Sequence, residues 1–164
     1  MYRTGHWGVS LVVFAPLGFA LLEAGYPELA FVSGAAMCWL AMLPDFDTRI
    51  PGLPHRGPTH TLLFAFLVGG VGGGAAFLVA TNAGQSDTAA VTLGAFGFAV
   101  GTLTVVAHLL GDVLTPMGVR PLWPVSSRKF TLSLWTADNT IANYGLFAVG
   151  LFAVAAAAYL SVLV

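Results

Sequence analysis

The sequence predicts an all-α protein, a polytopic bundle of about five transmembrane helices with a metal site at its cytoplasmic face. Hydrophobic residues make up 57% of the chain and charged residues only 8%, whereas roughly 25% of residues are charged in a typical soluble domain. Five apolar segments are long enough to cross a bilayer. Histidine and aspartate, which are metal-ligand residue types, recur beside the ends of these segments. We therefore expect residues 1–164 to form a single integral membrane domain.

The first two predicted helices are short and follow each other closely. They run from about residue 7 to 22 and from about residue 27 to 43, with a tight turn between them. A membrane helix needs about 20 apolar residues. We therefore expect these two helices to tilt or to be shielded partly by their neighbours.

The third and fourth predicted helices cover about residues 61–80 and 89–110. Small residues recur four positions apart in both helices, within the run 68–75 and at Gly97 and Gly101. Such spacing lets membrane helices approach closely. The glycines therefore indicate helix packing rather than a nucleotide-binding loop, which would need a following Gly-Lys-Ser/Thr.

The fifth predicted helix covers residues 140–164 and is apolar throughout. The third and fourth helices are joined by the short polar loop 81–88, whereas the connections 44–60 and 111–139 are longer. Part of the last connection, residues 121–135, mixes aromatic, aliphatic and basic residues. This mixture is typical of a segment that lies on a membrane surface.

Charge and cysteine content exclude some classes of protein. The net charge is −1, so there is no basic field for binding nucleic acid and we expect no such partner. The single cysteine, Cys38, cannot form an internal disulfide and lies in an apolar run. We interpret it as a small core residue.

The basic residues indicate the orientation of the chain in the cell membrane. With five spans, all six fall on the side of the N-terminus: Arg3, Arg49, Arg56, Arg120, Arg128 and Lys129. The charged residues on the opposite side are all acidic: Glu23, Glu28 and Asp87. The positive-inside rule therefore predicts that the N-terminus and both long connections lie in the cytoplasm.

Seven candidate functional residues fall at that same predicted membrane depth, although they lie far apart in the sequence. Placing an ionisable group at membrane depth costs about 3 kcal/mol on insertion scales, so such groups usually mark function. The candidates are His6, Asp45, Asp47, His55, His60, His108 and Asp112.

The spacing of these residues suits a shared site. His108 and Asp112 are four residues apart, so they share one face of a helix and can bind one ion. Asp45 and Asp47 follow Pro44 in a turn and can point toward one ion or toward two adjacent ions. His55 and His60 flank a tight turn at Gly57 and Pro58, and Thr59 is expected to cap the following helix.

Mixed imidazole and carboxylate ligands favour zinc, with manganese or iron as alternatives. Six or seven ligands exceed the four of a tetrahedral zinc, which suggests either two ions or one ion with supporting residues around it. Each residue taken alone has a simpler interpretation, as a packed histidine, a solvated loop acid or a topology anchor. We take the predicted metal ligands to be His6, Asp45, His60, His108 and Asp112.

The motifs in order resemble the YdjM-like family of predicted membrane-bound metal-dependent hydrolases. They are Leu-Pro-Asp-Phe-Asp at 43–47, His-Arg-Gly-Pro-Thr-His at 55–60, and His-Leu-Leu-Gly-Asp at 108–112 with Pro-Leu-Trp-Pro at 121–124. The resemblance covers the chain from His6 to about Trp135. It implies functional roles for Asp45, Asp47, His55, Arg56, His60, His108 and Asp112.

The segment 108–112, with Pro116 downstream, is also similar to the ligand helix of the zinc-dependent phospholipase C and single-strand nuclease group. Members of that group cleave phosphate esters with a zinc cluster held by histidines and aspartates. The similarity implies ligand roles for Asp45, His60, His108 and Asp112. A second His-xxx-Asp/Glu pair is absent from this sequence, which implies one or two ions rather than three.

Together these features predict a membrane-bound metal-dependent hydrolase of a lipid phosphoester, with the bilayer as its surroundings. The candidate catalytic residues are Asp47, His55 and Arg56. Whichever of Asp45 and Asp47 is not a ligand could act as general base, while Arg56 could hold an anionic substrate. The alternatives are a regulatory or scaffolding protein with a structural metal, which needs a closed site, and a metal transporter, which needs ligands near the bilayer midplane.

Overall fold

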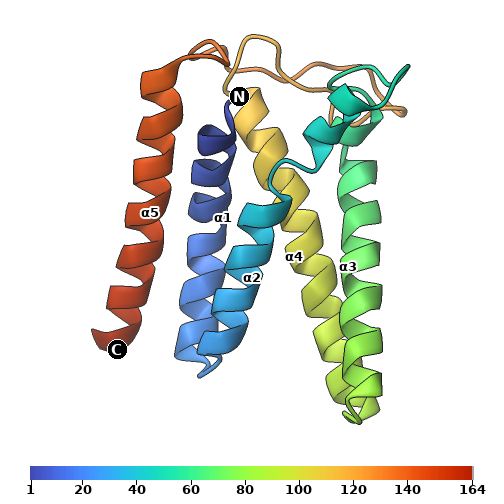
Figure 1. The fold of residues 1–164 in the computed structure, drawn as a ribbon, viewed down its shortest axis with the longest axis vertical. Helices are drawn as coiled ribbons and strands as arrows, with labels where there is room; N and C mark the ends of the chain where they lie inside the picture. Colours follow the sequence, from blue (N-terminus) through green and yellow to red (C-terminus); the bar gives the residue numbers. More distant parts are fainter. Residues whose placement is uncertain (164) are drawn as a thin grey trace.

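Five long helices build the protein in the computed structural model, which describes residues 1–163 (Figure 1). All five meet the length and hydropathy needed to cross a membrane, when the second is counted together with the residues up to Arg49. This confirms the predicted all-α fold and the predicted number of spans. The helices are α1 (Arg3–Glu23), α2 (Pro27–Leu40), α3 (Leu62–Asn82), α4 (Asp87–Val113) and α5 (Thr140–Leu163).

The chain after α2 differs from the predicted loop. The α-helix ends at Leu40, and two short 3₁₀ helices follow, η1 (Pro44–Arg49) and η2 (Pro58–His60). Both begin at a proline, which suits a first helical position because it has no amide hydrogen to leave unpaired. These two turns carry three of the four histidine and aspartate side chains predicted between α2 and α3 into fixed positions.

The prediction that Thr59 caps α3 is wrong. Thr61 occupies the N-cap position, where its side-chain oxygen accepts a hydrogen bond from the amide of Phe64 at 3.1 Å. The hydroxyl of Thr59 instead donates to the Asp47 carboxylate at 2.9 Å. The cap moves because η2 takes up residues 58–60 before the α-helix begins.

The tight turn between α1 and α2 follows from a glycine. Gly25 adopts φ = 79°, a left-handed conformation that glycine reaches without a steric penalty. The amide of Gly25 donates to the carbonyl of Leu22, and the amide of Tyr26 donates to that of Leu21. This is the Schellman arrangement, which satisfies the last carbonyls of α1. Pro27 then starts α2.

Glycines allow close packing within two helix pairs, α3 with α4 and α1 with α5. A Cβ atom added at Gly97 would lie 2.6 Å from the carbonyl oxygen of Gly72, and one added at Gly73 would lie 2.8 Å from that of Gly94. At the other pair, a Cβ atom at Gly150 would meet the backbone of Gly8. The predicted close approach of the glycine-rich helices is therefore confirmed, since larger residues would push the helices apart.

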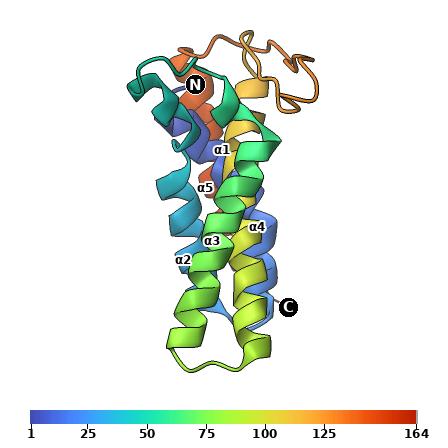
Figure 2. The ribbon, with the colours of Figure 1, turned by 90° about the vertical axis from the view of Figure 1, so that its right-hand side faces the viewer.

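The polar segments gather at one end of the bundle. Figures 1 and 2 show the N-terminus, the connection from α2 to α3 and the connection from α4 to α5 at that end. Residues 130–134 of the last connection pair with Val113, Leu114 and Val119, so this segment folds over the end of α4. In contrast, the helix faces carry exposed apolar side chains, as expected of helices surrounded by lipid.

The orientation of this polar end is a prediction that labelling can test. Cysteines placed by Arg49→Cys or Ser127→Cys, in a chain whose Cys38 is replaced by alanine, should react with a membrane-impermeant thiol reagent only after cells are opened. The reason is that all six basic residues lie in segments at this end. Asp87→Cys, at the opposite end, serves as the control and should react on intact cells. Labelling of residue 49 or 127 from outside would reverse the orientation.

Candidate metal centre

Four side chains from three separate segments bring one ligand atom each to a common point. Asp45 lies in η1, His60 ends η2, and His108 and Asp112 lie one turn apart in α4. Their ligand atoms are all within 4.8 Å of one another, and the side chains other than that of Asp45 are buried. We call these residues the four-ligand cluster.

The separations within the four-ligand cluster suit one tetrahedral ion. His60 Nε2 lies 3.2 Å from Asp45 Oδ1, 3.2 Å from His108 Nε2 and 3.4 Å from Asp112 Oδ2. His108 Nε2 lies 3.3 Å from Asp45 Oδ1 and 3.6 Å from Asp112 Oδ2. Ligands arranged tetrahedrally at zinc distances of about 2.0–2.2 Å would lie about 3.3–3.6 Å apart. The donor set therefore fits a zinc-sized ion.

Hydrogen bonds behind the two imidazole rings determine which nitrogen faces the four-ligand cluster. His108 Nδ1 lies 2.7 Å from the carbonyl oxygen of Ala41 and donates its hydrogen there. His60 Nδ1 lies 3.0 Å from the Thr59 hydroxyl oxygen and donates to it, because that hydroxyl donates its own hydrogen to Asp47. The Nε2 atom of each neutral ring then carries a lone pair. Two lone pairs and two carboxylate oxygens converge, which is the arrangement that binds a cation.

The two carboxylates of the four-ligand cluster favour positive charge between its atoms. Burial lowers the pKa of His60, but the carboxylates of Asp112 and Asp45 more than offset this and raise that pKa above its usual value. Among the described residues, Asp112 Oδ2 is buried without a hydrogen-bond partner. Such an orphaned oxygen costs at least about 1–3 kcal/mol. A bound cation would remove this cost.

Asp47 lies beside the four-ligand cluster and organises the loop that carries His60. Its carboxylate lies 2.9 Å from His55 Nδ1, 3.0 Å from the amide of Arg56, 2.9 Å from the Thr59 hydroxyl and 3.2 Å from His60 Nδ1. All four groups belong to residues 55–60, and the first three donate hydrogen bonds to the carboxylate, so one buried charge fixes the shape of the loop. A carboxylate behind a metal-binding histidine orients the ring and increases its basicity.

Asp47, His55 and His60 form a second group of potential ligands, which shares His60 with the four-ligand cluster. The rings of His55 and His60 lie 5.4 Å apart in an edge-to-face arrangement. His55 is 40% exposed, whereas Asp47 is fully buried. His55 is therefore the imidazole of the site that solvent or a substrate can reach, and Asp47 holds it from behind.

The guanidinium of Arg56 joins the loop to the end of α4. Arg56 Nη2 donates to Asp112 Oδ1 at 2.6 Å, and Nη1 donates to the Thr115 hydroxyl at 3.1 Å and to the Gly118 carbonyl at 3.0 Å. Its side chain is only 7% exposed. Its backbone has φ = 58°, which is uncommon outside glycine and persists when surrounding contacts hold it. Arg56 thus fixes a carboxylate of the four-ligand cluster in place.

His6 joins the site from α1 but is not one of the four converging ligands. Its ring stacks on that of His108, with centroids 3.8 Å apart and planes 1° from parallel. His6 Nε2 lies 3.6 Å from Asp112 Oδ1 and 4.0 Å from Asp45 Oδ2, the oxygens that face away from the four-ligand cluster. A Cβ atom at Gly111 would lie 3.1 Å from His6 Nδ1, so this glycine admits the ring.

Some residues that shape the site were not recognisable as candidates. The carbonyl of Ala41 holds His108, and only the predicted helix end before Pro44 signals that carbonyls there become free. Thr115 accepts from Arg56 and donates to the carbonyl of Asp112. The sequence gives no sign of the latter role, because a threonine after a helix end is common.

Replacing a ligand should reduce metal binding more than replacing a supporting residue does. We expect His60→Ala and His108→Ala each to weaken zinc binding by more than about 100-fold. Asp47→Asn should weaken it by about 10–100-fold, the effect typical of residues that orient a ligand. Metal titration of purified protein measures this, with Asp87→Ala as the control at the far end. Unchanged affinity in both histidine variants would mean that the residues form only a hydrogen-bond network.

Removing the buried guanidinium should destabilise the polar end of the bundle. Arg56→Ala leaves Asp112 Oδ1 without its closest partner, and breaking a buried ion pair in this way costs about 3–5 kcal/mol. Thermal unfolding in detergent should show a clear decrease in Tm. Arg49→Ala removes an equal charge from an exposed position and should leave the Tm nearly unchanged. Equal Tm values for the two variants would argue against the structural role of Arg56.

Comparison with known proteins assigns the family. The family model described as YdjM inner membrane protein matches residues 1–164, the whole chain. No curated protein and no solved structure matched. The resemblance carried by the ordered motifs at residues 43–47, 55–60 and 108–112 is thereby confirmed. The chain belongs to the YdjM family of inner membrane proteins.

Proposed function

We propose that this protein is a metal-dependent hydrolase that cleaves a phosphoester of a membrane lipid at the cytoplasmic face. The observation that carries the proposal is a cavity of about 670 Å³ that reaches the four-ligand cluster through Asp45. Asp45 is the one ligand of the four that is partly exposed, at 19%. A structural metal is usually closed off, whereas a catalytic metal must be reached by substrate.

The walls of this cavity suit an amphiphile with a negatively charged head group. Its apolar side is lined by Trp39, Leu40, Met42 and Leu43, where α2 ends, and by Phe46. Its polar side carries Arg3, Arg49, Asp45, Thr48 and His55. The Arg49 guanidinium lies 4.8 Å from the Phe46 ring and that of Arg3 lies 4.7 Å from the Trp7 ring. These contacts keep two cations at the cavity, where they can bind a phosphate.

The four-ligand cluster would hold one divalent ion, with zinc favoured and manganese as an alternative. A bound ion would polarise a phosphoryl oxygen and make water nucleophilic at neutral pH. Asp45 and Asp112 also place negative charge there, which Arg56 partly balances from behind Asp112. A second ion held by Asp47, His55 and His60 is the two-ion alternative.

His55 is the proposed general acid. Its ring borders the cavity and its Nδ1 atom is held by the Asp47 carboxylate at 2.9 Å. An imidazole fixed in this way presents Nε2 to the substrate and can protonate the leaving oxygen. Asp47 therefore supports catalysis through His55 and His60. Of the two aspartates considered as general base, Asp47 accepts hydrogen bonds from three donors and Asp45 faces the four-ligand cluster.

A structural metal is the second candidate, and one observation favours it. Four protein ligands complete a tetrahedral ion and leave no position for water. In that case, the ion would hold η1, η2 and α4 together, and the protein would act as a regulatory or scaffolding component of the membrane. Removing the ion would then lower the stability of the fold, and the protein would show no enzymatic turnover with or without the ion.

Replacing His55 should separate catalysis from structure. We expect His55→Ala to keep metal content and Tm, because the ring is outside the four-ligand cluster and partly exposed, but to lose about 100-fold or more in turnover. Phosphate release from a panel of lipid phosphomonoesters and diesters measures this on zinc-loaded protein. Asp87→Asn is the control and should keep full activity. If zinc-loaded wild-type protein cleaves nothing in the panel, the structural candidate is preferred.

A further inference from the structure

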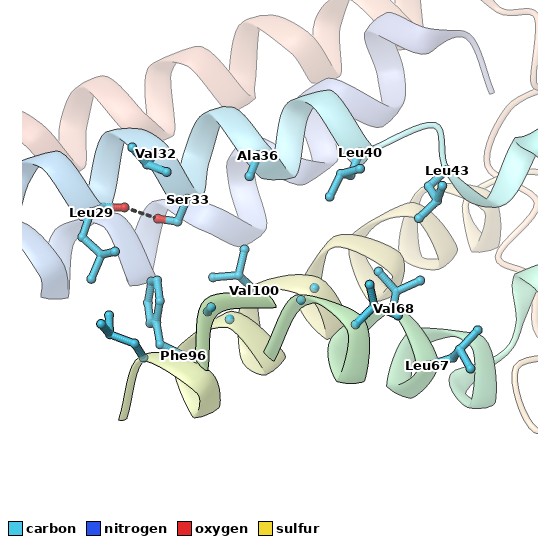
Figure 3. A pocket seen from close by; sticks show the side chains of 16 residues that line it. Leu29, Val32, Ser33, Ala36, Leu40, Leu43, Leu67, Val68, Phe96 and Val100 are labelled. Carbon is cyan, nitrogen blue, oxygen red and sulfur yellow. Dashed lines mark hydrogen bonds between the residues drawn. The ribbon is translucent and has the colours of Figure 1, made fainter. Parts of the chain in front are cut away.

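We infer that a groove between α2 and the α3–α4 pair holds one hydrocarbon chain of the lipid whose phosphate enters the cavity. This inference rests on the proposed function and specifies its substrate as a long-chain lipid phosphate. The groove has a volume of about 530 Å³ and is almost entirely apolar. Figure 3 shows Leu29, Val32, Ala36 and Leu40 of α2 along one side, and Val68 and Val100 on the other.

The lining of the groove presents no unpaired polar side chain to a hydrocarbon chain. The one hydroxyl among the lining residues belongs to Ser33, and it donates to the carbonyl of Leu29 at 2.6 Å within α2 (Figure 3). Hydrocarbon therefore meets only apolar atoms and satisfied backbone. A water-soluble ligand would gain no hydrogen bonds in this groove, whereas burial of apolar area contributes about 25 cal/mol per Å².

Glycines give the groove its depth. Gly72 of α3 and Gly97 and Gly101 of α4 line it without side chains. A Cβ atom at Gly72 would lie 2.9 Å from the carbonyl oxygen of Gly97, so the helices meet backbone to backbone. Because no side chains project from these positions, the contact between α3 and α4 forms the bottom of the groove, and α2 does not fill the space above it.

The groove adjoins the cavity of the proposed active site. Leu40, the last residue of α2, and Leu43 shortly after it line both. The cavity in turn contains Asp45 and two arginines. A lipid that places its phosphate beside Asp45 can therefore run its chain past Leu43 into the groove without crossing the protein.

The groove is long enough for a hydrocarbon chain that extends through one leaflet of a bilayer. From Leu29 to Leu40 the lining follows twelve residues of α2, or about 16 Å at the rise of an α-helix. Half of a hydrocarbon core of about 30 Å is about 15 Å. A chain of the length found in membrane lipids would thus be accommodated along α2 with its head group at the polar end.

Filling the groove tests the inference. Ala36→Phe places a ring in the groove, whereas Ala35→Phe makes the same change at an exposed neighbouring position that does not line it. The probe is a phosphatidic acid with a diazirine on one acyl chain, in vesicles of phosphatidylethanolamine and phosphatidylglycerol. We expect photolabelling of groove peptides in the wild type and in Ala35→Phe, and at least a tenfold decrease in Ala36→Phe.

A phosphatidylcholine with the same diazirine chain serves as the head-group control and should label the groove less than phosphatidic acid does. Equal labelling by both probes, or equal labelling of the two phenylalanine variants, would overturn the inference. Val71→Phe, on the opposite wall, repeats the test if Ala36→Phe does not fold.

Labelling does not require turnover, so it is separable from the proposed function. Groove labelling without hydrolysis of any lipid would retain the binding site and refute the hydrolase. If Ala36→Phe and Ala35→Phe hydrolyse lipid at equal rates and the groove of the wild type is not labelled, the proposed hydrolase activity stands and the proposed role of the groove is refuted.

Discussion

The two oxygens of the Asp112 carboxylate connect the polar end of this bundle. One oxygen receives the guanidinium of Arg56 at 2.6 Å, and the other faces the imidazoles of His60 and His108 at 3.4 and 3.6 Å. A nearly fully buried carboxylate is tolerated only when its charge is compensated. The loop of residues 55–60 and the last turns of α4 therefore have to meet at this point.

The fold could be predicted because the sequence features that determine it extend over whole segments of the chain. Composition and the lengths of five apolar segments suffice to predict membrane helices, and they do not depend on the identity of any one residue. The ends of helices depend on local competition, and here the prediction failed. Pro44 and Pro58 each begin a 3₁₀ helix, so α2 ends early and the cap of α3 moves from Thr59 to Thr61.

The gathering of the seven candidate residues at one end could be predicted, but the contacts that each of them makes could not. The seven candidates share one end because their segments are all connected there, which topology alone requires. Which carboxylate faces the cluster depends on the turn of η1, where Asp45 and Asp47 point to different partners. The backbone carbonyls that hold His108 and Arg56 carry no sequence signal, since every residue has one.

The shortness of α2 has a consequence for the bilayer itself. Its fourteen residues rise only about 21 Å, which is well below a hydrocarbon thickness of about 30 Å. The second span reaches a membrane-crossing length only when residues up to Arg49 are included, so the polar η1 turn forms part of the span. Such hydrophobic mismatch is relieved when the surrounding leaflet becomes thinner. Local thinning beside α2 would bring lipid head groups closer to Asp45. The protein would also be more stable in thin membranes than in thick ones.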